Sequence, residues 1–177
     1  MRVPDEEFWV ASGERRTEVG RTERTVEKEV VILIAEDDEG HAILIQRNLK
    51  RAGIRNELVV FKNGRAILDF MYGRGERQRE PGTPYVLLLD IGMPEVDGVE
   101  VLRQIRADRG LKKLPIIMIT TTDDPREVAR CHELGCSNYV TKPLDYNQFV
   151  EAIRRLGLFL LIVEIPKVDG ELATRNE

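Results

Sequence analysis

An unbroken apolar run that ends in a carboxylate restricts the fold of this chain more than any other feature. The run is Tyr85–Leu89, with Pro84 before it and Asp90 directly after it. Apolar runs of this length, bounded here by Pro84 on one side and by Pro94 and Gly98 on the other, are typical of strands buried on both faces of a parallel sheet. Ligands bind at the carboxyl ends of such strands. We therefore expect Asp90 at the ligand-binding edge of a sheet, although an aspartate there can also serve only as a turn residue or helix cap.

Apolar strands and amphipathic helices alternate along the chain from Val30 to Leu156. The pattern predicts strands near residues 30–35, 57–61, 85–90, 116–119 and 138–141. The helices are expected near residues 39–51, 64–72, 98–109, 125–135 and 145–156, with capping residues Asp38, Asn63, Asp97, Asp124 and Asp145. Alternation with short connections implies an α/β protein with a doubly wound, five-stranded parallel sheet covered on both faces.

The 177 residues leave room for one domain with extensions. Residues 1–29 are polar and rich in arginine and glutamate, which predicts a mobile arm; a docking arm through Trp9 is the alternative. Residues 30–157 form the expected domain. Residues 158–177 form an apolar C-terminal extension and tail, too short for a DNA-binding or enzymatic output domain.

Charge and hydropathy exclude two classes of partner. The net charge of -4 argues against a nucleic-acid surface. No apolar run approaches the roughly 20 residues of a membrane span, and no signal peptide opens the chain. The two cysteines, Cys131 and Cys136, lack a surrounding ligand set, and His132 is not on the helical face of Cys131. We expect two buried, reduced thiols and a cytoplasmic protein.

Polar side chains follow four of the five expected strands and should meet at one edge of the sheet. They are Glu36 and Asp37 after the first strand, Asp90 after the third, Thr120 after the fourth and Lys142 after the fifth. Clustered carboxylates repel one another, and a lysine with Mg²⁺ or Mn²⁺ would relieve that repulsion. A carboxylate can also act as a nucleophile and become an aspartyl phosphate. The alternative is that Lys142 only pairs with the acids and Thr120 only caps or turns.

Four motifs carry a resemblance to a known family. They are Ile-Leu-Ile-Ala-Glu-Asp-Asp at residues 32–38, Leu-Leu-Leu-Asp-Ile-Gly-Met-Pro-Glu-Val-Asp-Gly at 87–98, Ile-Ile-Met-Ile-Thr-Thr at 116–121 and Tyr-Val-Thr-Lys-Pro at 139–143. From about Val30 to Leu156 the chain resembles the receiver domain of two-component response regulators. The resemblance implies the flavodoxin-like (βα)5 receiver fold and phosphotransfer from a sensor histidine kinase.

The resemblance also implies a role for each site residue. Asp90 would be the phosphoacceptor and Lys142, joined to Pro143 by a cis bond, would contact the phosphoryl oxygens. Asp37 would bind Mg²⁺ directly. Asp90 itself, Glu36 through water and the carbonyl of Gly92 would complete the metal site. Thr120 and Tyr139 would form the switch pair that responds to phosphorylation. Glu36 stands where the family usually has aspartate.

The tail Leu-Phe-Leu-Leu-Ile-Val-Glu-Ile-Pro at residues 158–166 resembles regulators associated with bacterial and cyanobacterial phytochromes. This implies a bacteriophytochrome as the sensor kinase and a homodimer through the last helix and the extension. Nearly every residue from Leu158 to Ile165, after Gly157, is apolar, and Gly157 is a natural place for a helix to end or bend. Such a run would also leave an exposed patch of the kind that marks an interface. The alternative is that the tail folds back over its own domain.

Two other functions fit the sequence less well. A Mg²⁺-dependent phosphatase with an aspartyl-phosphate intermediate would need a second acid two residues after Asp90, where Gly92 stands. A flavodoxin-like cofactor binder would need a glycine-rich loop after the first strand, whereas residues 36–38 are acidic and would repel phosphate. We therefore expect a signalling protein that catalyses only its own phosphotransfer and dephosphorylation.

Overall fold

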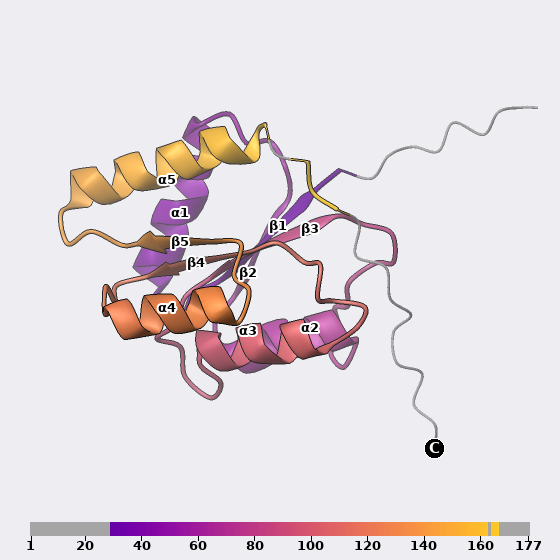
Figure 1. Ribbon diagram of the computed structural model, residues 1–177. Coiled ribbons are helices and arrows are strands. Elements are labelled where there is room, and N and C mark those ends of the chain that lie inside the picture. Colours follow the sequence, from indigo (N-terminus) through magenta and orange to yellow (C-terminus); the bar gives the residue numbers. More distant parts are fainter. Residues whose placement is uncertain (1–28, 163, 167–177) are drawn as a thin grey trace, which may run out of the picture.

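The computed structural model describes residues 29–162 and 164–166, which form a sheet between two layers of helices (Figure 1). The strands are β1 (Val31–Ala35), β2 (Leu58–Phe61), β3 (Tyr85–Leu89), β4 (Ile116–Thr120) and β5 (Asn138–Thr141). The helices are α1 (Glu39–Arg51), α2 (Gly64–Tyr72), α3 (Gly98–Ala107), α4 (Pro125–Glu133) and α5 (Tyr146–Leu160). The predicted arm before residue 29 and the tail after residue 166 lie outside the described residues.

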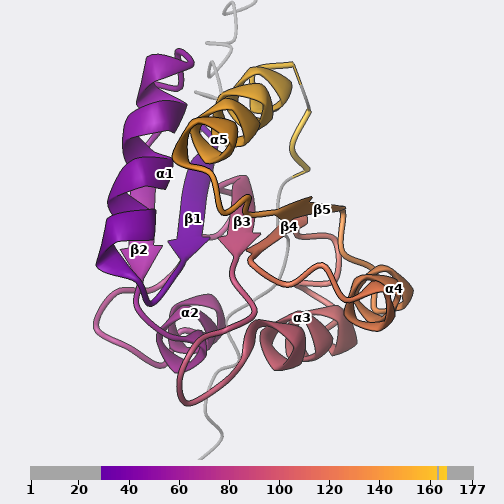
Figure 2. The same cartoon turned by 90° about the vertical axis from the view of Figure 1, so that its left-hand side faces the viewer.

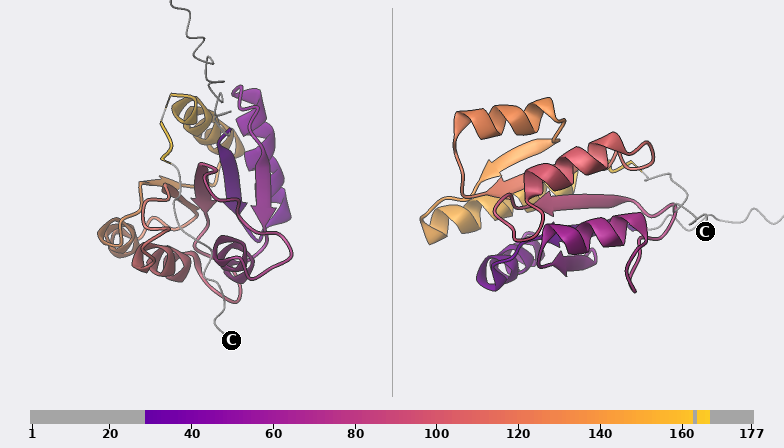
Figure 3. Two further views of the ribbon diagram at one scale, coloured as in Figure 1. Left: turned by 90° about the vertical axis from the view of Figure 1, so that its right-hand side faces the viewer. Right: turned by 90° about the horizontal axis from the view of Figure 1, so that it is seen from below.

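The sheet is parallel throughout, in the order β2-β1-β3-β4-β5. Helices α1 and α5 cover one face, and α2, α3 and α4 lie side by side on the other (Figures 1 and 3). The prediction of a doubly wound sheet is therefore confirmed. The chain moves outward from β1 in opposite directions to β2 and to β3, so the carboxyl ends of β1 and β3 form the switch point at which such sheets bind ligands.

Alternate residues of the central strands supply two apolar cores. In β3, Leu87 and Leu89 pack under α2 and α3, whereas Val86 and Leu88 pack under α1 and α5. All residues of β3 and β4 are buried, which is why these strands appear in the sequence as continuous apolar runs. The two cores fix the position of the strand ends and therefore of the residues that follow them.

Each helix begins at the capping residue expected from the sequence. The side chains that accept a backbone N–H of the first turn are Asp38, Asn63, Asp97, Asp124 and Asp145. These bonds satisfy donors that the helix itself cannot satisfy. Among the helices of the described segments, none is both long and apolar enough to cross a membrane.

The last helix does not end at Gly157 but continues to Leu160. A Cβ placed on Gly157 would lie 2.7 Å from the Cβ of Ala52. The glycine therefore lets α5 approach the end of α1 closely. Beyond it, Leu160 and Ile165 pack against the core under α1 and α5, so part of the extension folds onto its own domain.

The prediction of two buried thiols is correct for only one cysteine. Both are free, but Cys131 is buried and Cys136 is half-buried. The sulfur of Cys136 lies 3.6 Å from Nδ1 of His132. His132 and Cys136 meet because they are four positions apart across the end of α4. Burial raises the pKa of the Cys131 thiol to about 11.

Candidate functional site

The polar residues expected at the sheet edge meet there. β1 and β3 are paired in register, with Ala35 opposite Leu89, so Glu36 and Asp90 leave adjacent strand ends (Figure 2). The backbone N–H of Asp90 donates to the Ala35 carbonyl at 2.9 Å. Four residues of the site are almost completely buried, with exposed fractions of 2–8%: Glu36, Asp90, Thr120 and Lys142.

Three carboxylates share one small volume. Oxygens of Glu36, Asp37 and Asp90 all lie within 4.8 Å of one another. Asp37 is exposed, whereas the other two are buried, so the cluster opens to solvent on one side. An oxygen-only donor set with room for water is the arrangement that Mg²⁺ and Mn²⁺ prefer. The residues present therefore fit a hard divalent cation.

Lys142 neutralises part of this charge. Its Nζ lies 2.6 Å from Oε2 of Glu36 and 3.3 Å from Oδ2 of Asp90. Burial raises the pKa of the Glu36 carboxyl, and the ammonium group opposes that rise. The expected cis bond to Pro143 is absent: the peptide is trans, as none of the described residues has a cis bond. Because Lys142 reaches both acids from the trans form, the pairing does not require the less favourable isomer.

The sequence did not single out His41, which also belongs to the site. Its Nδ1 lies 3.4 Å from Oε1 of Glu36, and its ring forms a T-shaped pair with that of Phe149 at a centroid distance of 5.8 Å. Its backbone N–H donates to Oδ1 of the capping residue Asp38 at 2.7 Å. The signal in the sequence is a histidine in the first turn of the helix that follows the acidic segment.

Thr120 and Tyr139 both contact Thr122, in the segment after β4. The Thr120 hydroxyl accepts from the Thr122 N–H at 3.4 Å, and the Tyr139 hydroxyl donates to the Thr122 carbonyl at 3.0 Å. Tyr139 is half-buried, and burial raises the pKa of its phenol to about 12. Near neutral pH the phenol therefore remains a hydrogen-bond donor to this segment.

Gly92 lies in the loop after Asp90, between the buried Ile91 and Met93. It is exposed, and a Cβ placed on it would be 3.9 Å from Oδ2 of Asp90. The backbone at Gly92 thus passes close to the aspartate, and no carboxylate is present at this position to act as a second acid.

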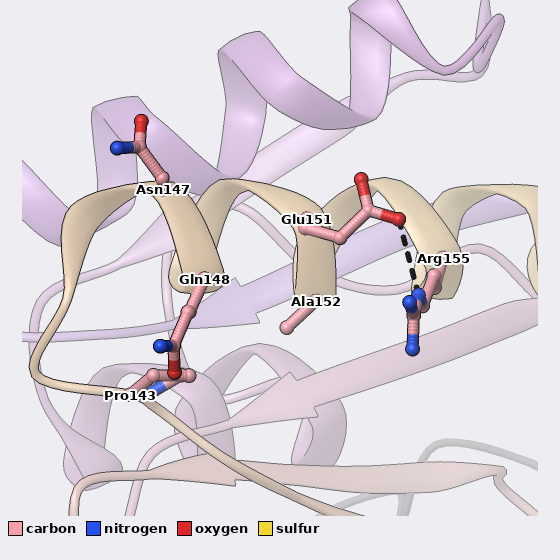
Figure 4. A pocket seen from close by; sticks show the side chains of 6 residues that line it. All are labelled: Pro143, Asn147, Gln148, Glu151, Ala152 and Arg155. Carbon is pink, nitrogen blue, oxygen red and sulfur yellow. Dashed lines mark hydrogen bonds and ion pairs between the residues drawn. The ribbon is translucent and has the colours of Figure 1, made fainter.

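Two hollows adjoin the site. Glu36 and Asp37 line one of about 250 Å³, which Ile43 of α1 and Lys62 after β2 also border. A second, of about 460 Å³, lies between Pro143 and the side of α5 that carries Gln148 and Ala152 (Figure 4). Its remaining walls come from α5, including the ion pair of Glu151 and Arg155. The first hollow therefore reaches two of the three acids, whereas none of the three lines the second.

Comparison with known proteins agrees with this geometry. Residues 32–154 match the model of the response regulator receiver domain. Response regulator Rcp1 of Synechocystis is 32% identical over 131 residues, which are 74% of this chain and 88% of the relative. A receiver domain from Rhodospirillum rubrum is 38% identical, with a TM-score of 0.75 over 79% of this chain and 99% of that chain. The bacteriophytochrome response regulator RtBRR is 39% identical, with a TM-score of 0.60 over 72% and 76%.

Proposed function

The chain belongs to the response regulator receiver family, and from this premise we propose that it accepts a phosphoryl group onto Asp90 from the phosphohistidine of a sensor histidine kinase. The observation that carries the proposal is a buried aspartate beside one lysine and two further acids. A carboxylate oxygen of Asp90 attacks phosphorus, the phosphorus–nitrogen bond breaks, and the imidazole leaves. The product is an aspartyl phosphate.

The neighbours of Asp90 are suited to its increase in negative charge. Oδ1 of Asp90 accepts the N–H of Ile91 at 2.9 Å, and Oδ2 faces Lys142. We propose that Lys142 moves its ion pairing from Glu36 toward the phosphoryl oxygens. The Thr120 hydroxyl turns from Thr122 to the same oxygens, and Tyr139 turns inward behind it. A buried ion pair that can exchange partners is a device for a two-state response.

We propose that Asp37, Asp90 and the carbonyl of Gly92 hold Mg²⁺ or Mn²⁺ directly and that Glu36 assists through water. The exposed side of the cluster leaves room for water ligands. The bound cation supplies charge neutralisation for the phosphoryl oxygens. A structure of Rcp1, 31% identical to this chain with a TM-score of 0.71 over 77% of it and 98% of that chain, is an Mn²⁺-bound form.

Intact-mass measurement after incubation with Mg²⁺ and a small acyl phosphate tests the phosphoacceptor. Wild-type protein gains one phosphoryl group, and hydroxylamine, which cleaves acyl phosphates, removes it. Asp90→Asn gains none, because it keeps the shape of the side chain and loses the nucleophile. Asp69→Asn, the same change on α2, is the matched control and behaves as wild type. A hydroxylamine-labile phosphoryl group on Asp90→Asn contradicts the assignment.

We further propose that the donor kinase is a bacteriophytochrome. Support comes from the resemblance of the tail at residues 158–166 and from the likeness to RtBRR. Phosphotransfer from a purified phytochrome kinase and from an unrelated sensor kinase, compared at equal concentration, tests this partner. Faster transfer from the phytochrome kinase is expected, and equal rates contradict it.

We also propose a homodimer through the end of α5. Four large apolar side chains there are 43–82% exposed: Leu158, Phe159, Leu161 and Ile162. Burying about four such side chains contributes roughly 6 kcal/mol before the costs of association, which suits a pair of copies about a two-fold axis. Leu160 does not contribute to this apolar surface, because it packs onto the core of its own domain.

Sedimentation of the full chain at micromolar concentration tests the dimer. We expect Phe159→Glu with Ile162→Glu to convert it to monomer. Lys112→Glu, on the exposed surface after α3, changes the net charge equally and leaves the dimer intact. Wild-type protein that sediments as a monomer with and without phosphorylation contradicts the proposal.

A further inference from the structure

The loop between Asp90 and α3 rests against the first residue of α2. A Cβ placed on Gly64 would lie 2.0 Å from the carbonyl oxygen of Val96 and 2.9 Å from Cγ2 of Val101. Figure 2 shows the loop from β3 passing α2 before it enters α3. A side chain at Gly64 would displace the loop, so the contact requires glycine.

Asn63 joins the same loop through its side chain. Its Oδ1 accepts the N–H of Ala66 at 2.7 Å, which caps α2. Its Nδ2 donates to Oε1 of Glu95 at 2.8 Å. The amide oxygen of Asn63 therefore caps α2, while its amide nitrogen binds the loop that carries Glu95.

Glu95 adopts a backbone conformation that residues with side chains rarely adopt. Its φ is 65°, in the left-handed region, and it is the only non-glycine residue with positive φ in the described ranges. The Val96 N–H bonds the Pro94 carbonyl at 2.8 Å, which closes a tight turn around Glu95. The bond from Asn63 anchors the side chain of this strained turn.

The turn is connected to the backbone next to Asp90. The N–H groups of Met93 and Gly98 both donate to the Ile91 carbonyl, at 2.9 and 3.0 Å. Gly92 lies inside this small hydrogen-bonded loop. Glu95 and Val96 are therefore linked to the backbone on either side of Gly92 by a few residues that are hydrogen-bonded together.

We propose that Asn63 and Gly64 are positioning residues for the cation site: they hold the loop so that the carbonyl of Gly92 points toward the acidic cluster. The inference rests on the proposed function, in which that carbonyl is a ligand. Partners that orient metal ligands commonly affect affinity on the order of 10–100-fold when removed. The start of α2 thereby becomes part of the metal site without touching the ion.

Asn63→Asp separates this role from helix capping. Aspartate keeps the acceptor for Ala66, so α2 stays capped. It removes the donor and places a carboxylate against Glu95, which pushes the turn away. An added negative charge acting only through space would strengthen cation binding, whereas a displaced loop weakens it. We expect Mg²⁺ affinity, measured by titration calorimetry, to fall on the order of tenfold with little change in melting temperature.

Adding Glu95→Gln to Asn63→Asp supplies a new donor at position 95, so the hydrogen bond between the two side chains forms again with donor and acceptor exchanged. The double variant also has the net charge of the wild type. This pair should recover Mg²⁺ affinity. Asp108→Ala, which removes a loop-stabilising acceptor for Gly110 and Leu111, is the structural control: it lowers the melting temperature and leaves Mg²⁺ affinity unchanged. In cation-free protein, Asn63→Asp alone should speed hydrogen exchange at the Val96 and Gly98 amides.

The outcomes distinguish this inference from the proposed function. Wild-type protein that binds no Mg²⁺, or binds it equally after Asp37→Asn, overturns the cation site and this inference with it. Wild-type protein that binds Mg²⁺ through Asp37, beside an Asn63→Asp variant of equal affinity, overturns this inference alone. Weaker binding without recovery in the double variant also overturns it, because the bond to Glu95 would not be the cause.

Discussion

Lys142 makes its shortest contact with Glu36: Nζ lies 2.6 Å from Oε2 of a glutamate that is 2% exposed. The ammonium group of Lys142 therefore neutralises part of the negative charge of the buried acids when no metal ion is bound. Removing one partner of a buried pair leaves an uncompensated charge, which destabilises a protein by about 3–5 kcal/mol.

We accordingly expect Lys142→Ala to lower the free energy of unfolding of cation-free protein by about 3 kcal/mol. Mg²⁺ should restore part of the loss, since it neutralises the same carboxylates. Denaturant unfolding with and without Mg²⁺ measures both effects, and Lys142→Met, which keeps most of the volume, separates charge from packing. Wild-type stability in the methionine variant would show that the charge is unimportant.

Asp37→Asn should move stability and cation affinity in opposite directions. In cation-free protein the change relieves repulsion among three carboxylates and raises the melting temperature. Mg²⁺ affinity should fall by at least the roughly tenfold that loss of an outer partner causes. Thermal unfolding and titration calorimetry measure the two effects. Glu133→Gln, on the exposed end of α4, removes one charge elsewhere and should change neither.

The pH dependence of stability should change in Tyr139→Phe. Burial raises the pKa of Tyr139 from 10.0 to about 12, so folding favours its protonated form. The associated stabilisation is fully present below pH 10 and is lost as the pH rises toward 12. Because the side chain is only half-buried, solvent screening reduces the effect. Unfolding followed from pH 9 to 12 should show a smaller loss in the variant; identical slopes would contradict the burial of this phenol.

Gly157→Ala should destabilise the protein although alanine favours helices. The helix gain is about 1 kcal/mol. The new methyl group would meet Ala52 at 2.7 Å, and overpacking of this kind costs about 1–3 kcal/mol. Combining the change with Ala52→Gly removes the collision and should restore the unfolding midpoint. A double variant less stable than both single variants would argue against this contact.

Much of the fold could be predicted because its signals are local. Continuous apolar runs marked β3 and β4, and capping residues such as Asn63 marked the helix starts. The acidic cluster was also predictable, since parallel strands bring their carboxyl ends to one edge. What these features share is that they depend on neighbours in the chain or on topology alone.

The features that sequence reasoning missed depend on how elements pack. The contact of His41 with Glu36 needs the rotation of α1 about its axis. Gly157 suggested a helix end, but its missing Cβ serves an approach to Ala52, 105 positions earlier in the chain. The second function of Asn63, beyond capping, becomes visible only when the loop bearing Glu95 is placed beside it.

The place of β5 at the margin of the sheet divides the site into a fixed and a movable half. Glu36 and Asp90 follow central strands, each hydrogen-bonded on both sides and packed between two cores. Tyr139 lies in β5 and Lys142 follows it, and this strand is bonded only to β4 and has no fully buried residue. Local opening of such a strand exposes little apolar surface and requires less free energy than opening the centre. Glu36 and Asp90 thus follow the rigid centre of the sheet, whereas the ammonium group of Lys142 and the ring of Tyr139 are carried by its margin, which can shift with little loss of buried apolar contact.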